Sequence, residues 1–152
     1  MTNDDVAREI LRAHSYVVLA TVNAEGAPWA SPVWFAMEES PELYWVSRPN
    51  ARHSQNIEAR PQIAMVVFDS TAAPGVRQAV YLTAIARQVT DPVEIEHGIA
   101  VFSRKSVREG AGAFGVNEIT SPAELRLYRA SVQECWILDP DVDVRISVPL
   151  NG

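Results

Sequence analysis

Cationic side chains gather at a predicted helix start within Leu43–Pro61 (LYWVSRPNARHSQNIEARP). The stretch is typical of a short apolar strand, a turn, and a helix that ends before the final proline. Asn50 is a favourable N-cap, so the first backbone N–H groups of the helix would point outward as free donors. Arg52 and His53 are unfavourable at a helix N-terminus unless an anion binds there and balances the positive charge. The pattern therefore predicts an anion site; the alternative is that Arg48, Arg52 and Arg60 are ordinary solvated arginines.

Composition narrows the classes of partner. The 152 residues are 47% hydrophobic and 21% charged, which is typical of one globular domain spanning 1–152. A net charge of -6 argues against nucleic acid. The single cysteine, Cys135, excludes an internal disulfide and a cysteine metal cluster. The N-terminus lacks the basic start and apolar core of a signal peptide, and no apolar run approaches membrane-spanning length. We therefore expect a cytoplasmic protein with no nucleic-acid or membrane partner, whose local positive patch binds a small anion.

No motif in the chain supplies an acid, base or nucleophile. The segment 110–115 matches GxGxxG, but it follows a predicted helix instead of a strand, which indicates a loop near a site and not a dinucleotide fingerprint. Glu94, Glu96 and His97 lack a second histidine at helical spacing, so no metal site is predicted. Cys135 in an apolar strand indicates a packed thiol. If the protein is an enzyme, a cofactor is expected to carry the chemistry.

The elements that must position these residues are mostly strands. Alternation and β-branched content predict strands at 16–22, 28–37, 43–47, 62–69, 78–89, 125–138 and 142–148. Helices are predicted at 2–14, 51–58 and from 91 to about 103, and a loop at 104–122. The length of 78–89 predicts a bulge within it. Six or seven strands in hairpins with few helices indicate a mainly β fold, a small antiparallel barrel with helices packed outside.

The order of the pieces resembles a known family. These are VVLATVNAEGAPWASPVWF, LYWVS, ARHSQNIEARPQIAMVVFD, RQAVYLTAIARQVTD and VFSRKS. Together they resemble the pyridoxamine 5′-phosphate oxidase-like family, the flavin-binding split barrels, over about 17–106 and more loosely through the strand at 125–138. The resemblance implies a six- to seven-stranded antiparallel split barrel. It also implies a homodimer with the cofactor at the interface.

The resemblance implies a cofactor site in which the second strand, the end of the third and the next helix start hold the phosphate. His53, three places before Asn56, stands where the family usually has Lys, and histidine is only partly charged at neutral pH. Gln78 is expected to contact the isoalloxazine ring, and Trp29 with Trp34 could line an aromatic face. The residues implied are Ser31, Pro32, Val33, Trp34, Val46, Ser47, Arg52, His53, Asn56 and Gln78.

The function implied is that of an FMN-dependent oxidoreductase, with hydride transfer to or from a small molecule. Three alternatives stay open: a reductase of the same fold that uses the deazaflavin F420, a protein that binds a flavin or haem without catalysis, and a barrel that has lost cofactor binding, for which His53 in place of Lys is the only support. Ala36 stands where the vitamin-processing oxidases carry a substrate-binding lysine, and their C-terminal Trp- and Arg-rich signature is absent. We therefore do not expect this chain to oxidise pyridoxamine phosphate.

Overall fold

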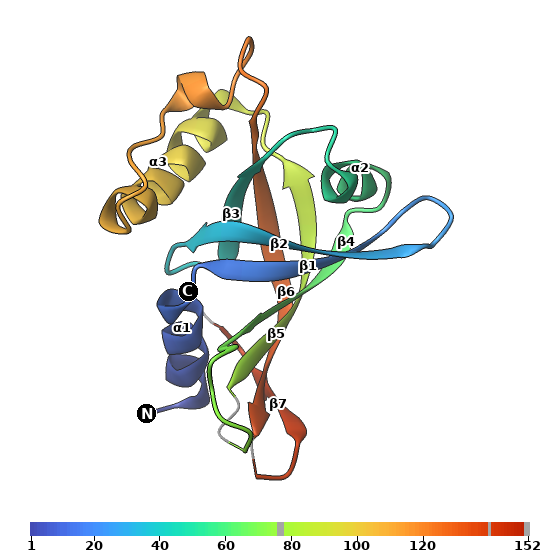
Figure 1. Cartoon of the computed structure of the whole chain (residues 1–152), viewed down its shortest axis with the longest axis vertical. Coiled ribbons are helices and arrows are strands. Elements are labelled where there is room, and N and C mark those ends of the chain that lie inside the picture. Colours follow the sequence, from blue (N-terminus) through green and yellow to red (C-terminus); the bar gives the residue numbers. More distant parts are fainter. Residues whose placement is uncertain (76–77, 140, 151–152) are drawn as a thin grey trace.

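The computed structural model describes residues 1–75, 78–139 and 141–150, and in this part the elements follow the predicted order (Figure 1). The strands are β1 (Tyr16–Val22), β2 (Pro28–Met37), β3 (Glu42–Ser47), β4 (Gln62–Phe68), β5 (Ala79–Gln88), β6 (Arg126–Asp139) and β7 (Val144–Val148). The helices are α1 (Asn3–Ala13), α2 (Arg52–Ala59) and α3 (Pro92–Arg108), and a short 3₁₀ turn, η1, is Val116–Glu118.

One antiparallel sheet closes into a barrel. Its strand order is β3-β2-β1-β4-β5-β6-β7, and β3 also pairs with β6. This closing pair runs from Glu42 opposite Ser131 to Ser47 opposite Arg126. Six strands therefore form the closed barrel, and β7 continues the sheet along the far half of β6. The prediction of a mainly β, antiparallel split barrel with helices packed outside is confirmed.

Alternation along the strands divides the apolar residues into an inner and an outer core. In β2, Val33 and Phe35 are buried inside the barrel, whereas Trp34 and Ala36 face outward beneath α3. This follows because successive side chains of a strand point to opposite faces of the sheet. The inner core includes Trp45, which is fully buried. The outer core joins α3 to β2 and β3.

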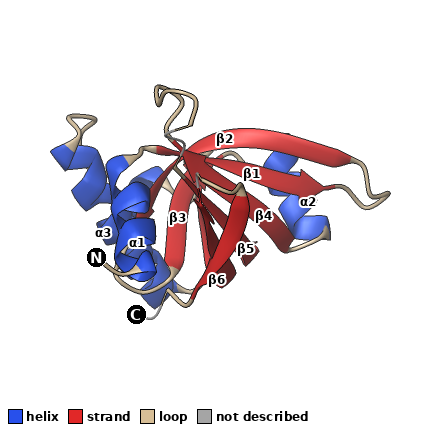
Figure 2. Cartoon of the chain, turned by 90° about the horizontal axis from the view of Figure 1, so that it is seen from below, coloured by secondary structure: helices blue, strands red, loops and turns tan. Residues whose placement is uncertain are grey.

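The helices lie on two sides of the barrel, α1 and α3 on one and α2 on the other (Figure 2). Helix α1 begins with the predicted capping box, in which Thr2 and Asp5 bond each other's backbone N–H. It buries Ala7, Ile10 and Leu11. No described helix has both the length and the apolar content needed to cross a bilayer.

Helix α3 begins as predicted but ends later. Asp91 is the N-cap and accepts a hydrogen bond from the Glu94 N–H at 3.1 Å. The helix continues through Arg108, so the expectation of a loop over all of 104–122 is wrong for its first five residues. Residues 104–108 show no apolar helical pattern in the sequence, because an inward-facing, buried position among them is held by a charged residue, Lys105.

Lys105 fastens α3 to the barrel rim. Its Nζ donates to the carbonyls of His14 at 3.0 Å and Phe35 at 2.6 Å. Burial lowers the pKa of this amine to about 8. The two carbonyls replace part of the hydration that the ammonium loses, which allows a lysine to sit in an apolar setting.

Strand β5 is continuous where the sequence predicts a bulge. Its consecutive residues Thr83 and Ala84 pair with Glu134 and Val132 of β6. The extra residue is therefore Gln133 of β6, and the prediction of a bulge within 78–89 is wrong.

Near the end of β5, Arg87 pairs with Glu94 at 2.8 Å, and Arg129 of β6 binds the same carboxylate. Glu94 therefore does more than occupy the first turn of α3. Its carboxylate ties the start of α3 to two strands.

Candidate functional site

The His53 imidazole lies between two serine hydroxyls at the barrel end nearest α2. Ser31 Oγ of β2 is 3.3 Å from Nδ1, and Ser47 Oγ at the end of β3 is 2.9 Å from Nε2. Ser47 is buried and His53 half-buried. Both serines occupy the inward-facing register of their strands, so a ring entering from α2 reaches both. We call Ser31, Ser47, Arg52 and His53 the cradle.

The protonation state of His53 decides what the cradle offers. Burial lowers the pKa of His53, which favours the neutral ring at neutral pH. A neutral imidazole donates from one nitrogen and accepts at the other, so one serine hydroxyl must donate its hydrogen bond to the ring. Only the other hydroxyl is then free to donate outward. A protonated ring donates from both nitrogens, and both hydroxyls can then donate to an anion.

Helix α2 begins one residue later than predicted. The expectation that Asn50 is the N-cap is wrong: Ala51 holds that position, because its N–H bonds the Arg48 carbonyl at 3.1 Å and closes a turn that contains Asn50. Ala51 makes no side-chain cap, and the first turn contains no acidic residue. The first N–H groups of α2 therefore lack the side-chain acceptor that a helix start usually has, and an anion would supply it.

Arg52 stands at this uncapped start. Its guanidinium carbon lies 4.2 Å from the centroid of the Trp29 ring, a cation–π distance. Two other arginines of the predicted positive patch have structural partners: Arg48 pairs with a glutamate that precedes β6, and Arg60 donates to two carbonyls of the β1–β2 turn. Arg52 differs from these two arginines because its guanidinium packs on the Trp29 ring, and its side chain is exposed to solvent.

Asn56 supports the cradle from below. Its Nδ2 donates to Thr21 Oγ1 of β1 at 3.0 Å, and both residues are buried. The side chain predicted to contact a cofactor is therefore engaged inside the chain. It fixes α2 against the barrel and so fixes the height of His53 above the serines.

Four other predicted residues lie near the cradle in sequence but point elsewhere. Pro32 is exposed on the outer face of β2, and Val33 is buried in the inner core. Trp34 packs edge-on against a phenylalanine of α3 with ring centroids 4.9 Å apart, and Val46 joins the same outer core. Trp29 and Trp34 thus lie on opposite faces of β2. Within one chain they do not form a single aromatic face.

Gln78 is remote from the cradle in the single chain. The strand next to it begins with Ala79 opposite Phe68, whereas Gln62, just after α2, pairs with Ile85. Six residues of strand therefore separate the two ends, about 20 Å at 3.3 Å per residue. One chain does not bring Gln78 to Arg52 or His53.

The remaining sequence motifs do not join the cradle. His97 Nε2 lies 2.8 Å from a carboxylate oxygen of Glu38. Cys135 is a buried thiol whose pKa burial raises to about 12, as its prediction as a packed residue requires. Over 1–75, 78–139 and 141–150, no three side chains of the His, Cys, Asp and Glu types gather as metal ligands.

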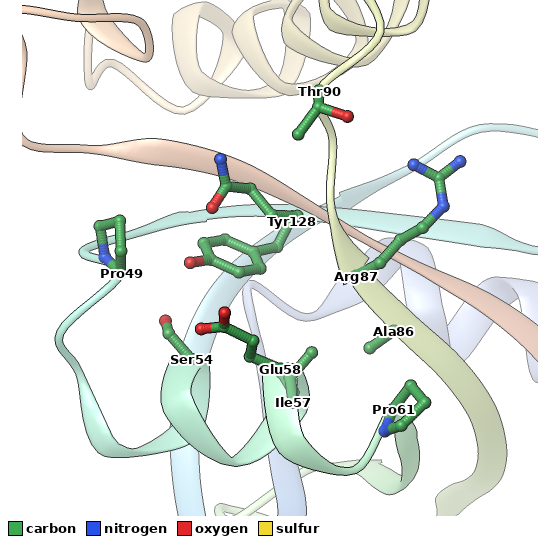
Figure 3. Close-up of a pocket in the computed structure, with 10 residues that line it drawn as sticks. Pro49, Ser54, Ile57, Glu58, Pro61, Ala86, Arg87, Thr90 and Tyr128 are labelled. Carbon is green, nitrogen blue, oxygen red and sulfur yellow. The ribbon is translucent and has the colours of Figure 1, made fainter.

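Sequence reasoning missed a cavity of about 350 Å³ on the other side of α2 (Figure 3). It is lined by Pro49, Ser54, Ile57, Glu58, Pro61, Ala86, Arg87, Gln88, Thr90 and Tyr128. None of the ten predicted cofactor residues is among them. The lining comes from α2, β5 and β6, which only the closed barrel brings together, and the spacing of these residues gave no signal.

Solved structures of other proteins resemble this chain over almost its whole length. A heme binding protein from Mycobacterium smegmatis is 17% identical with a TM-score of 0.74, over 97% of this chain and 58% of that one. HutZ, the heme storage protein from Vibrio cholerae, is 23% identical with a TM-score of 0.69, over 90% of this chain and 95% of that one. Campylobacter jejuni ChuZ is 15% identical with a TM-score of 0.74, over 95% of this chain and 58% of that one.

At these identities the structural likeness establishes the fold. The chain spans little more than half of the Mycobacterium and Campylobacter proteins. No curated protein matches the sequence. A family model described as pyridoxamine 5′-phosphate oxidase matches residues 4–137, which includes the barrel through most of β6. On this match and the closed six-stranded barrel, the chain belongs to the pyridoxamine 5′-phosphate oxidase family.

Proposed function

We propose that this protein is a homodimeric flavin-dependent oxidoreductase that holds the phosphate of FMN in the cradle of Ser31, Ser47, Arg52 and His53. The observation that carries the proposal is the start of α2, which has no side-chain cap, no acidic residue in its first turn, and Arg52 beside a histidine held by two serines. When bound, the flavin would supply hydride transfer to or from a small molecule.

The donor set suits a phosphate monoester. Arg52 offers a planar fork of N–H donors, the helix start offers backbone N–H groups, and the serines offer hydroxyls. His53 adjusts the number of hydroxyl donors through its protonation. Because burial lowers the pKa of His53 in the free protein, an arriving anion favours proton uptake at this ring. The chain thus orients the phosphate, and the His53 imidazole takes up a proton when the phosphate binds.

An apolar outer face of the sheet supports the proposed homodimer. Tyr16, Phe68 and Ile85 are large apolar residues exposed by 61%, 48% and 37%. The outward positions of β1 and β4 between them hold Val18, Ala20, Ala64 and Val66. Contiguous apolar surface of this kind marks interaction sites in soluble proteins. A second copy covering this face would also give Gln78 a route to a cofactor held by the other chain.

Haem binding is the second candidate function. Two of the structural relatives are described as a heme binding protein and a heme storage protein, and both share the barrel. F420 in place of FMN is a third form of the cofactor proposal. These options predict different visible spectra, so one set of titrations separates them.

The decisive experiment titrates the purified protein separately with FMN, F420 and haemin, monitored by visible absorption. Micromolar FMN binding that weakens about tenfold or more in Arg52→Ala is expected, because a charge-assisted hydrogen bond contributes about 1.5–3 kcal/mol. Arg48→Ala is the matched control, since it removes the same charge from the same segment but from an ion pair outside the cradle.

Three outcomes would change the conclusion. Haemin binding without FMN binding would favour the second candidate. F420 binding alone would replace the cofactor but keep the cradle. FMN binding unaltered by Arg52→Ala would move the phosphate away from α2.

A further inference from the structure

The cavity between α2 and strands β5 and β6 is enclosed enough to hold a small molecule. Its volume of about 350 Å³ is at the lower end of ligand pockets, which suits a molecule of one or two rings. It shares α2 with the cradle but uses the other side of the helix. His53 faces the serines of β2 and β3, whereas Ser54 and Glu58 line the cavity.

The apolar part of the cavity is rigid. Tyr128 of β6 is 3% exposed, and its ring stacks on Trp45 with centroids 6.0 Å apart and planes 10° apart. Ile57 and Ala86 are buried beside it, and a proline lies at each end of the α2 segment. Because Trp45 belongs to the inner core, the tyrosine ring has a fixed plane. Tyr128, Ile57 and Ala86 are 3%, 2% and 0% exposed, so they form a preorganised floor of which a ligand contacts only a small part.

The polar part of the cavity is acidic. Figure 3 shows Ser54, Glu58 and Tyr128 converging, while the Arg87 guanidinium points away from them. Arg87 is neutralised by Glu94 at 2.8 Å. Glu58 has no ion-pair partner among the residues that the structure describes. Its charge is felt within the pocket: burial is the main cause that raises the pKa of the Tyr128 phenol, the nearby Ser54 hydroxyl opposes the rise, and Glu58 adds to it.

We propose that this cavity binds a small planar molecule that carries a protonated amine or amidine group. The flat body packs on Tyr128 and the apolar residues beside it, and the cationic N–H donors bind the Glu58 carboxylate. Ser54 Oγ has no hydrogen-bond partner within the described part of the chain but is itself buried, so the further acceptor for the ligand is the Tyr128 hydroxyl. Charge-assisted bonds to a carboxylate in a half-enclosed site select a cation over an anion of the same shape. This proposal does not depend on what the cradle binds.

The test uses benzamidine as the cationic probe and benzoate as its anionic counterpart, on the full chain, followed by amide shifts in NMR titrations. Benzamidine should shift amides around Glu58, Ala86 and Tyr128 and bind at least about tenfold more tightly than benzoate. Glu58→Gln should weaken benzamidine about tenfold, and Tyr128→Phe by a few-fold. Glu9→Gln, an exposed acid on α1, is the matched control and should change nothing.

Four results would overturn the proposal, and the first three concern benzamidine without FMN. These three are equal binding of benzamidine and benzoate, unchanged affinity in Glu58→Gln, and shifts confined to residues away from the cavity. Competition between benzamidine and FMN at one site would also overturn it, because the cavity would then belong to the cradle. Glu58 is exposed, so its substitution leaves the fold intact and these results remain readable.

Discussion

Helices α2 and α3 begin in opposite ways. Helix α3 starts with an Asp91 cap, a proline at its first position, and Glu94 bound to arginines of two strands. Helix α2 starts with Ala51, no side-chain cap, and Arg52 and His53 where an acid would be favourable. The same physics governs both ends, since free N–H groups and a positive helix end seek negative charge.

The difference separates a structural helix from a functional one. The chain itself supplies the cap and the negative charge that the start of α3 needs, so this helix start contributes to stability. The start of α2 has no such cap or negative charge within the part of the chain that the structure describes, and an external anion would supply them. Of the four substitutions below, ordered by expected effect, Asp91→Ala opens the closed start and Ala51→Asp closes the open one, whereas Gly98→Ala tests the packing of α3 and His53→Lys the charge at the start of α2.

Gly98→Ala should cause the largest loss of stability. A Cβ at Gly98 would lie 2.7 Å from both Leu127 Cδ2 and Tyr44 Cε1, so α3 or these two side chains must shift. Overpacking of this kind costs about 1–3 kcal/mol. Urea denaturation measures the free energy of unfolding. Adding Leu127→Ala makes room, so the double variant should lose less than the sum of the two single losses; simple additivity would contradict the close contact.

His53→Lys should strengthen FMN binding at pH 8 by about tenfold, roughly 1.4 kcal/mol, because a permanent charge replaces a neutral ring. In the unaltered protein the pKa of His53 is lowered by burial and raised by a bound phosphate. Binding therefore takes up a proton, and FMN affinity should rise as pH falls from about 8 to 6.5. Fluorescence titrations should show this slope for the wild type and a flat profile for His53→Lys. The same slope with riboflavin, which lacks the phosphate, would contradict the assignment.

Asp91→Ala opens the start of α3 and should lower the free energy of unfolding by about 1 kcal/mol. FMN affinity should stay within error of the wild type, because this helix start faces no cradle. Thermal denaturation and one FMN titration suffice. A large loss of FMN affinity would mean that α3 positions the cofactor, and the contrast between the two helices would fail.

Ala51→Asp closes the start of α2 and should have the smallest effect on the free protein, a gain of about 0.5–1 kcal/mol in the free energy of unfolding. The same change should weaken FMN, since a carboxylate then occupies the N–H groups. Asn50→Asp places an identical charge one residue earlier, inside the turn, and serves as the control. Equal losses of affinity in the two variants would indicate plain charge repulsion and not a shared binding position.

The strands and the start of α3 were predictable because local signals decide them. Alternation marks the buried face of each strand, and Asp91 followed by Pro92 specifies a helix start. In the candidate site, sequence pointed to Arg52, Ser31, Ser47 and His53, which the fold brings to one end of the barrel.

What escaped prediction depends on contacts between distant segments. Lys105 can be helical and buried because the carbonyls of two distant residues accept hydrogen bonds from its ammonium group. The sequence shows only its charge, so 104–108 were predicted as a loop. Asn50 has the chemistry of a cap, but the preceding turn fixes Ala51 there instead. Gln78 directly precedes β5, whose other end lies near α2, so its position relative to the cradle depends on the register of that strand and not on sequence spacing.

Strand β6 sets the order in which the barrel can assemble. It pairs with β3, which lies about 80–90 residues earlier in the chain, along its first half and with β7 along its second. Pairings so distant in sequence are slow to form because the loop they close is long. A chain emerging from the ribosome therefore holds β3 and β5 with unpaired edges until residue 139 is available. We expect fragments that stop before β6 to aggregate, since both edges of the unfinished sheet stay open to other chains.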